Sequence, residues 1–75
     1  MHRWINPQTN RYYLADLVQD LLGDWTLVRC WGAVGSRRGR LRVTAVDSEA
    51  VGLALIAAIG QRRRQHGYRP EVEVG

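Results

Sequence analysis

The chain has 75 residues and a formal net charge of +4, from eleven arginines and no lysine against seven acidic residues. A chain of this length has room for one hydrophobic core and hides only about 60% of its unfolded surface on folding, which excludes a second domain. The basic charge favours polyanionic partners, although many small domains carry such a charge for solubility alone.

The first half of the chain is typical of strands. Residues 3–5 are either an edge strand or a clip over the core, and the segment Asn6–Asn10 predicts a turn because Pro fixes φ and Asn tolerates left-handed geometry. Residues 11–18 are rich in strand formers, and alternation places Tyr13, Ala15 and Leu17 on one face. A helix over residues 14–22 also fits the apolar spacing, and we favour the strand.

Two further strands enclose a glycine- and arginine-rich loop. We expect strands at residues 25–31 and 40–46, after a hairpin turn at Gly23-Asp24. The loop between them, residues 32–39, holds three glycines, which permit positive φ and a close approach of the backbone to a ligand. Two arginines, Arg37 and Arg38, lie in this loop.

A helix is predicted last. Asp47 or Ser48 is placed to cap it, and Gly67 to stop it. The helical period gives one stripe that should lie on the sheet, made of Val51, Ala54, Leu55, Ala58, Ile59 and Arg62. Leu53 and Ile56 then fall on the outer side, where a second subunit could cover them. Residues 71–75 alternate like a short strand but are equally compatible with disorder.

The predicted alternation also sorts the basic residues. If Tyr13, Leu17, Val28, Cys30, Leu41, Val43 and Ala45 face the helix, the opposite face holds Arg29, Trp31, Arg40 and Arg42. A tryptophan flanked by guanidinium groups would then be exposed beside a basic loop. An error of one residue in register would move every side chain to the other face.

These residues carry a resemblance to a known family. Tyr12-Tyr13 opens a strand, Trp25 begins the next, and the segment Arg29-Cys-Trp-Gly-Ala-Val-Gly35 follows. The pattern resembles the WGR domain, the small DNA-binding module of the poly(ADP-ribose) polymerases that also occurs in short stand-alone bacterial proteins. The resemblance covers about residues 10–68 within a single domain of residues 1–75. It implies an α+β fold, with a small antiparallel sheet of three to five strands against one C-terminal helix.

The resemblance also implies a binding site. The motif tryptophan, Trp31, would stack on the sugar of a nucleotide at a DNA 5′ end. Phosphates would be held by residues around the following loop, and the candidate DNA-binding residues are Arg29, Trp31, Gly32, Gly35, Arg37, Arg38, Arg40 and Arg42. Ala33 departs from the family, whose name-giving arginine takes part in communication between the domains of the polymerases. This loss bears on interdomain signalling more than on DNA contact.

Each of these residues also has a plainer interpretation. Trp31 could be a core residue at a strand end, and the arginines of the loop could be a solvated hairpin tip. Residues 62–64 could extend a basic track, but charge near a helix C-terminus usually complements the helix dipole, and we favour that interpretation. No catalytic arrangement is visible, so the sequence predicts a nucleic-acid-binding module and no enzyme. The alternative is a protein-interaction or self-assembly module that uses the outer helix face, through Leu53 and Ile56, or a sheet edge.

The remaining composition excludes other classes of site. The single cysteine, Cys30, excludes an intramolecular disulfide, and together with two distant histidines it cannot complete a tetrahedral zinc site. Neither a metal nor another cofactor is expected. The longest apolar run, residues 51–60, is shorter than the roughly 20 residues needed to span a bilayer. A cytoplasmic protein without membrane contact is therefore predicted.

Overall fold

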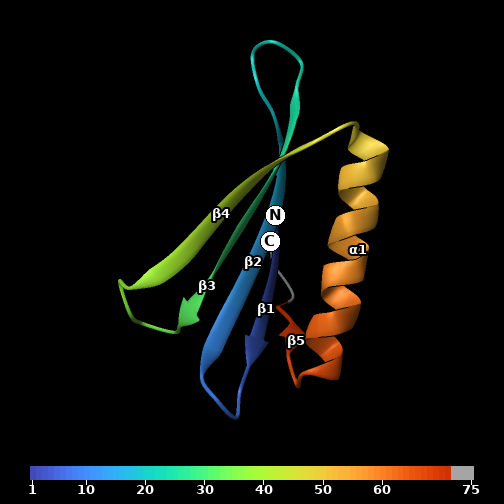
Figure 1. Cartoon of the computed structure of the whole chain (residues 1–75). Helices are drawn as coiled ribbons and strands as arrows, with labels where there is room; N and C mark the ends of the chain where they lie inside the picture. The colour runs from blue at the N-terminus through green and yellow to red at the C-terminus, as the bar shows by residue number, and fades with distance from the viewer. Residues whose placement is uncertain (72–75) are drawn as a thin grey trace.

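The computed structural model describes residues 1–71 and contains one antiparallel sheet with one helix on one of its faces (Figure 1). The elements in chain order are β1 (His2–Asn6), β2 (Arg11–Gln19), β3 (Trp25–Ala33), β4 (Gly39–Val46), α1 (Glu49–Gln65) and β5 (Arg69–Pro70). The five strands are arranged in the order β4-β3-β2-β1-β5. The predicted α+β class, with a small antiparallel sheet and a C-terminal helix, is confirmed.

The strands also settle the alternatives that the sequence left open. Residues 11–19 form strand β2, not a helix. The N-terminal segment is a strand inside the sheet, because β1 pairs with β2 on one side and with β5 on the other. Trp4 on β1 is a core residue, with 5% of its surface exposed. The short strand β5 was not predicted. For residues 71–75 the sequence leaves a strand and disorder equally open, and of these five residues only Glu71 is among the described residues.

Helix α1 packs on the sheet through small residues. The buried positions of the helix are Gly52, Ile56 and Gly60, one helical turn apart. A Cβ atom at Gly52 would overlap the end of the Leu17 side chain, and one at Gly60 would lie 3.1 Å from the Trp4 ring. The glycines therefore let the helix approach β1 and β2 closely.

Ile59 packs against the core as predicted, but the predicted contact stripe of the helix was wrong in other members. Leu55 and Val51, which belong to it, are 41% and 43% exposed, whereas Ile56 is 4% exposed and lies in the core. Glycine carries no apolar side chain, so the true contact face has almost no hydrophobic signal in the sequence. Ile56 therefore cannot form an outer apolar pair with Leu53, which is 50% exposed.

Both ends of the helix are closed by polar contacts. The Ser48 hydroxyl accepts a hydrogen bond from the Val51 amide at 3.1 Å, which confirms it as the N-cap. At the other end, the buried side chain of Asn6 donates to the His66 carbonyl at 3.1 Å. Asn6 thereby links the first turn of the chain to the end of the helix. Within residues 1–71, the structure has no helix long and apolar enough to cross a membrane.

Candidate nucleic-acid interface

The strand register decides which side chains share the helix-covered face of the sheet. Tyr13 and Ala15 are core residues of β2, and they lie opposite Trp31 and Arg29 on β3. Those two residues in turn lie opposite Arg40 and Arg42 on β4, and directly opposed side chains point to the same face. The helix-covered face of β3 and β4 therefore includes Arg29, Trp31, Arg40 and Arg42.

This placement confirms one half of the sequence prediction and corrects the other. The four residues share a face, as predicted, but it is the face on which the helix packs. The predicted helix-facing positions of β3 and β4 were wrong, because Val28, Cys30, Leu41, Val43 and Ala45 point to the uncovered side. Alternation groups residues by face but does not say which face is covered.

Trp31 lies near the end of β3, two residues before the strand ends at Ala33. Its indole ring stacks on Tyr13, with ring centroids 5.6 Å apart and an angle of 9° between the planes. The side chain is half-buried and packs against the core, as the plainer interpretation of this tryptophan expects, and it still reaches the surface. A hollow of about 280 Å³ lies beside it, lined by Arg11, Trp31, Gly32, Ala33, Arg38, Gly39 and Arg40.

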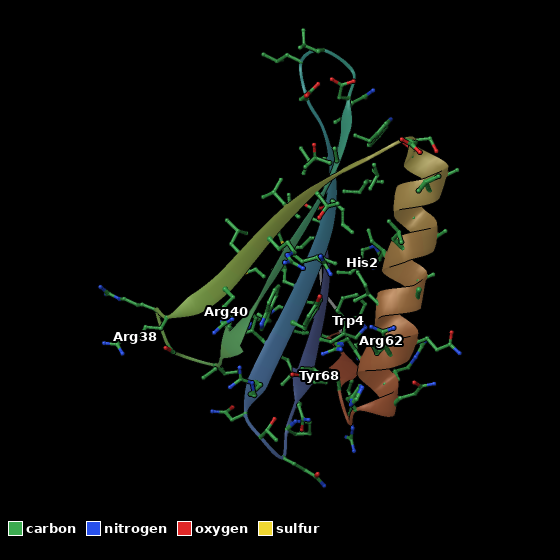
Figure 2. All side chains as sticks on the ribbon, in the orientation of Figure 1. His2, Trp4, Arg38, Arg40, Arg62 and Tyr68 are labelled. Atoms are coloured by element: carbon green, nitrogen blue, oxygen red, sulfur yellow. The ribbon has the colours of Figure 1, made fainter. Side chains whose placement is uncertain are left out.

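The loop after β3 carries the remaining predicted residues. Arg37 and Arg38 are exposed, and Figure 2 shows Arg38 at the outer end of the loop, with Arg40 set back along β4. Gly35 has a φ of 81°, and a Cβ atom there would meet nothing within 4 Å. The Arg38 amide donates to the Ser36 hydroxyl at 3.0 Å, which fixes the turn. The loop thus carries two exposed guanidinium groups, of which Arg38 lines the Trp31 hollow.

The structure explains why glycine occupies positions 32 and 39 without involving a ligand. They are paired across β3 and β4, and the Tyr12 side chain lies over both of them on the uncovered face. A Cβ atom at Gly39 would lie 2.7 Å from the Tyr12 hydroxyl oxygen, and one at Gly32 would lie 3.4 Å from its ring. Neither glycine has positive φ. Their small size makes room for Tyr12.

A second hollow, which we call the α1 groove, opens between α1 and strands β3 and β4. It has a volume of about 360 Å³, and its basic lining residues are Arg29, Arg62 and Arg63. Figure 2 shows Arg62 on α1, on the side toward the strands. The guanidinium carbon of Arg63 lies 4.7 Å from the centroid of the Tyr13 ring. The helix therefore brings its own arginines to the face that holds Trp31.

Three of these cations were not predicted from the sequence. Arg11 lies across from Ala33 and lines the Trp31 hollow, and the helix positions Arg62 and Arg63 line the α1 groove. Alternation along β2 already put Arg11 on the face of Tyr13, so this residue could have been found. Arg62 was already on the stripe that the helical period places on the sheet, whereas the place of Arg63 depends on how the helix lies on the sheet.

The basic residues of this region are not neutralised by the acidic ones. Among residues 1–71 the ion pairs join Arg3 to Glu71, at 3.0 Å, and the N-terminal amine to Asp16, at 3.6 Å. Within the same range, no acidic side chain lines either hollow. The described residues also contain no group of three or more His, Cys, Asp or Glu side chains placed to hold a metal. The chemistry that these surfaces offer is the binding of anions.

The opposite side of the sheet is apolar and has no cover within the described residues. We call it the open sheet face; its apolar members are Leu14, Val28, Cys30, Leu41 and Val43. Leu41 and Val43 are 66% and 59% exposed. The Tyr12 hydroxyl and the Cys30 thiol share a hydrogen bond at 3.6 Å, which raises the pKa of Tyr12 above its ordinary value of 10.0.

Comparison with known proteins adds a family and one relative. The family model described as the WGR domain matches residues 2–74. The chain is 32% identical over 68 residues to "Uncharacterized protein y4dW" of Sinorhizobium fredii (strain NBRC 101917 / NGR234), a match that covers 88% of this chain. The matched region is 33% of that relative's length, so the chain spans about a third of it. No solved structure matches the chain significantly.

Proposed function

The chain belongs to the WGR domain family, and we propose that it is a sequence-tolerant module that binds duplex DNA at ends or nicks. The WGR domain is commonly a nucleic-acid-binding module, and it is a binding domain rather than a catalytic one. The finer assignment to DNA ends rests on Trp31. A flat ring at the edge of a basic surface can stack on a terminal sugar or base where a strand ends or is broken, whereas inside an intact duplex the base faces are covered by the neighbouring bases.

The observation that carries this proposal is the set of side chains around Trp31. Its ring is supported from behind by Tyr13, at 5.6 Å, and a hollow beside it is lined by Arg11, Arg38 and Arg40. The stacked ring offers a flat apolar surface, and the guanidinium groups match phosphate oxygens. No element of the described chain resembles a recognition helix for the major groove, so phosphates and the strand end, not base edges, provide the binding energy.

The loop arginines provide the first test. We expect the double change Arg37→Gln/Arg38→Gln to lower the slope of log K against log salt concentration by about two, since each phosphate that is no longer neutralised removes roughly 0.9. The measurement is fluorescence anisotropy with a blunt duplex over a salt series. Both side chains are exposed, so the variant should keep its fold.

A matched control removes the same charge elsewhere. Arg64 and Arg69 are exposed; Arg64 lines a different hollow, with Trp4 and Pro70, and Arg69 lies on β5 at the sheet edge opposite β4. Arg64→Gln/Arg69→Gln should leave the salt slope nearly unchanged. Equal decreases of slope in the two double variants would mean that the protein binds DNA only through its net charge.

The open sheet face supports a second candidate function, as a protein-interaction or self-assembly module. Leu41 and Val43 are 66% and 59% exposed on a strand that forms one edge of the sheet. Exposed apolar patches and free strand edges are common sites of association. If copies associate through this face, sedimentation velocity should show a dimer at high concentration, and Leu41→Lys should return it to a monomer. A monomer at every concentration would remove self-assembly from consideration.

A further inference from the structure

The α1 groove combines an apolar wall with several positive charges. The wall comes from Leu27 on β3 and from Leu55 and Ile59 on the helix, and the charges come from Arg29, Arg62 and Arg63. Its volume of about 360 Å³ is at the lower end of the roughly 300–1,000 Å³ of small-ligand sites. A space of this size can hold about one nucleotide and is too small for a duplex.

The charges in the groove have unmet hydrogen-bonding capacity. The Nε atoms of Arg29 and Arg63 are buried, and neither has a hydrogen-bond partner within the described part of the chain. Burying an unpaired polar or charged group is unfavourable, and an anion in the groove would supply acceptors. The groove lining, as far as the structure describes it, contains no acidic residue that could do so. Three guanidinium groups around an apolar wall are therefore placed for a ligand that is partly apolar and carries a phosphate.

The groove lies next to Trp31. Tyr13 lies between the two, because its ring stacks on Trp31 and lies 4.7 Å from the Arg63 guanidinium. Arg29 follows the same face of β3, two residues before Trp31. A strand that leaves the duplex end at Trp31 and continues along this face of the sheet therefore meets the groove next.

We infer that the α1 groove holds one unpaired nucleotide of a DNA strand that continues past the duplex end, with its phosphate on Arg29, Arg62 and Arg63. This inference rests on the proposed binding of DNA ends at Trp31. It adds a preference that the proposed function alone does not contain. The protein should distinguish an end that carries a single-stranded overhang from a blunt end.

Arg62 gives the cleanest test because it is exposed and takes no part in the core. The measurement is anisotropy over a salt series with a blunt duplex and with the same duplex carrying a short 5′ or 3′ overhang. The unaltered protein should bind one of the overhang duplexes about fivefold more tightly at about 0.1 M salt, with a salt slope steeper by roughly 0.7 for each phosphate bound on the single strand. Arg62→Gln should remove most of this advantage, and Arg62→Glu should remove all of it.

Arg64→Gln is the matched control. Arg64 is in the same last turn of the helix but lines a hollow with His2 and Trp4 on the other side, so the change has the same effect on charge and on the helix dipole. It should keep the preference for the overhang. The inference is overturned if Arg62→Gln and Arg64→Gln behave alike, or if the unaltered protein binds blunt and overhang duplexes equally.

Blunt-end binding separates this inference from the proposed function. If the unaltered protein binds the blunt duplex, and Trp31→Ala weakens that binding, a missing overhang preference disproves the groove assignment alone. If the unaltered protein binds none of the DNAs at low salt, the proposed function fails and the groove assignment fails with it. Thermal unfolding of each variant shows whether the arginine substitutions leave the fold intact.

Discussion

Trp31→Ala should lower the affinity for a blunt or nicked duplex about 10- to 100-fold, the range expected when one stacked aromatic ring is removed. Trp31 has no charge, so the slope of log K against log salt concentration should stay the same, while log K decreases by the same amount at every salt concentration. This combination differs from the effect expected for the loop arginines, which changes the slope. The measurement is the same anisotropy series, and Trp31→Phe should restore part of the affinity.

The control for Trp31 is Trp25 on the same strand. Both tryptophans are half-buried and lie on the helix-covered face, but Trp25 is at the start of β3, paired with Gln19 and Val46. Removing either ring should cost stability, because each buries a large apolar surface. Trp25→Ala should nevertheless leave DNA affinity close to that of the unaltered protein. An equal decrease of affinity in both variants would show that the effect comes from a weakened fold, not from a missing stacking surface.

Gly52→Leu should lower the free energy of unfolding by about 1–3 kcal/mol, the usual cost of overpacking, because the Leu17 side chain occupies the space that a side chain at Gly52 needs. Even a single Cβ atom at Gly52 would overlap Leu17. A domain of 75 residues has roughly 4–11 kcal/mol of stability in all, so much of the fold's margin would be lost. Urea unfolding followed by circular dichroism measures the change.

Helix propensity alone predicts the opposite sign for Gly52→Leu. Glycine is about 0.8–1.0 kcal/mol less favourable than alanine inside a helix, and leucine ranks just below alanine, so a more stable variant would show that Gly52 does not contact the sheet. Ala54→Leu is the matched control, because Ala54 is two residues away and exposed. It should change the stability by less than about 0.5 kcal/mol.

The pattern of apolar and polar residues was sufficient to predict the strands and the helix, but not to predict which residues of the helix contact the sheet. The strands were predictable because β2, β3 and β4 alternate with a period of two, and the helix because Ser48 caps it and Gly67 follows its end. The contact face of the helix was not predictable in this way. Two of its three buried residues are glycines, and close packing through glycine depends on the partner surface, here Leu17 and Trp4.

The sequence predicted which strand residues of the candidate site share a face of the sheet, but not which face that is. Register kept Arg29, Trp31, Arg40 and Arg42 together, and this depends only on alternation. Which face the helix covers depends on how much apolar surface each face of the sheet can bury, and both faces contain apolar atoms. On β4 the helix side carries Arg40, Arg42 and Thr44, whose long arginine stems can lie along apolar surface while the charged heads stay near water. The more apolar side, with Leu41 and Val43, stays open.

The sheet order also has a consequence for the way the domain forms. β1 lies between β2 and β5, and the Asn6 side chain binds the His66 carbonyl across 60 positions of sequence. The hairpins β1–β2, β2–β3 and β3–β4 join neighbouring segments and can pair early, whereas the second edge of β1 is paired only by residues near 70. Contacts between such distant segments slow folding. During synthesis on the ribosome, the domain would therefore hold an unfinished sheet until its last strand has left the exit tunnel.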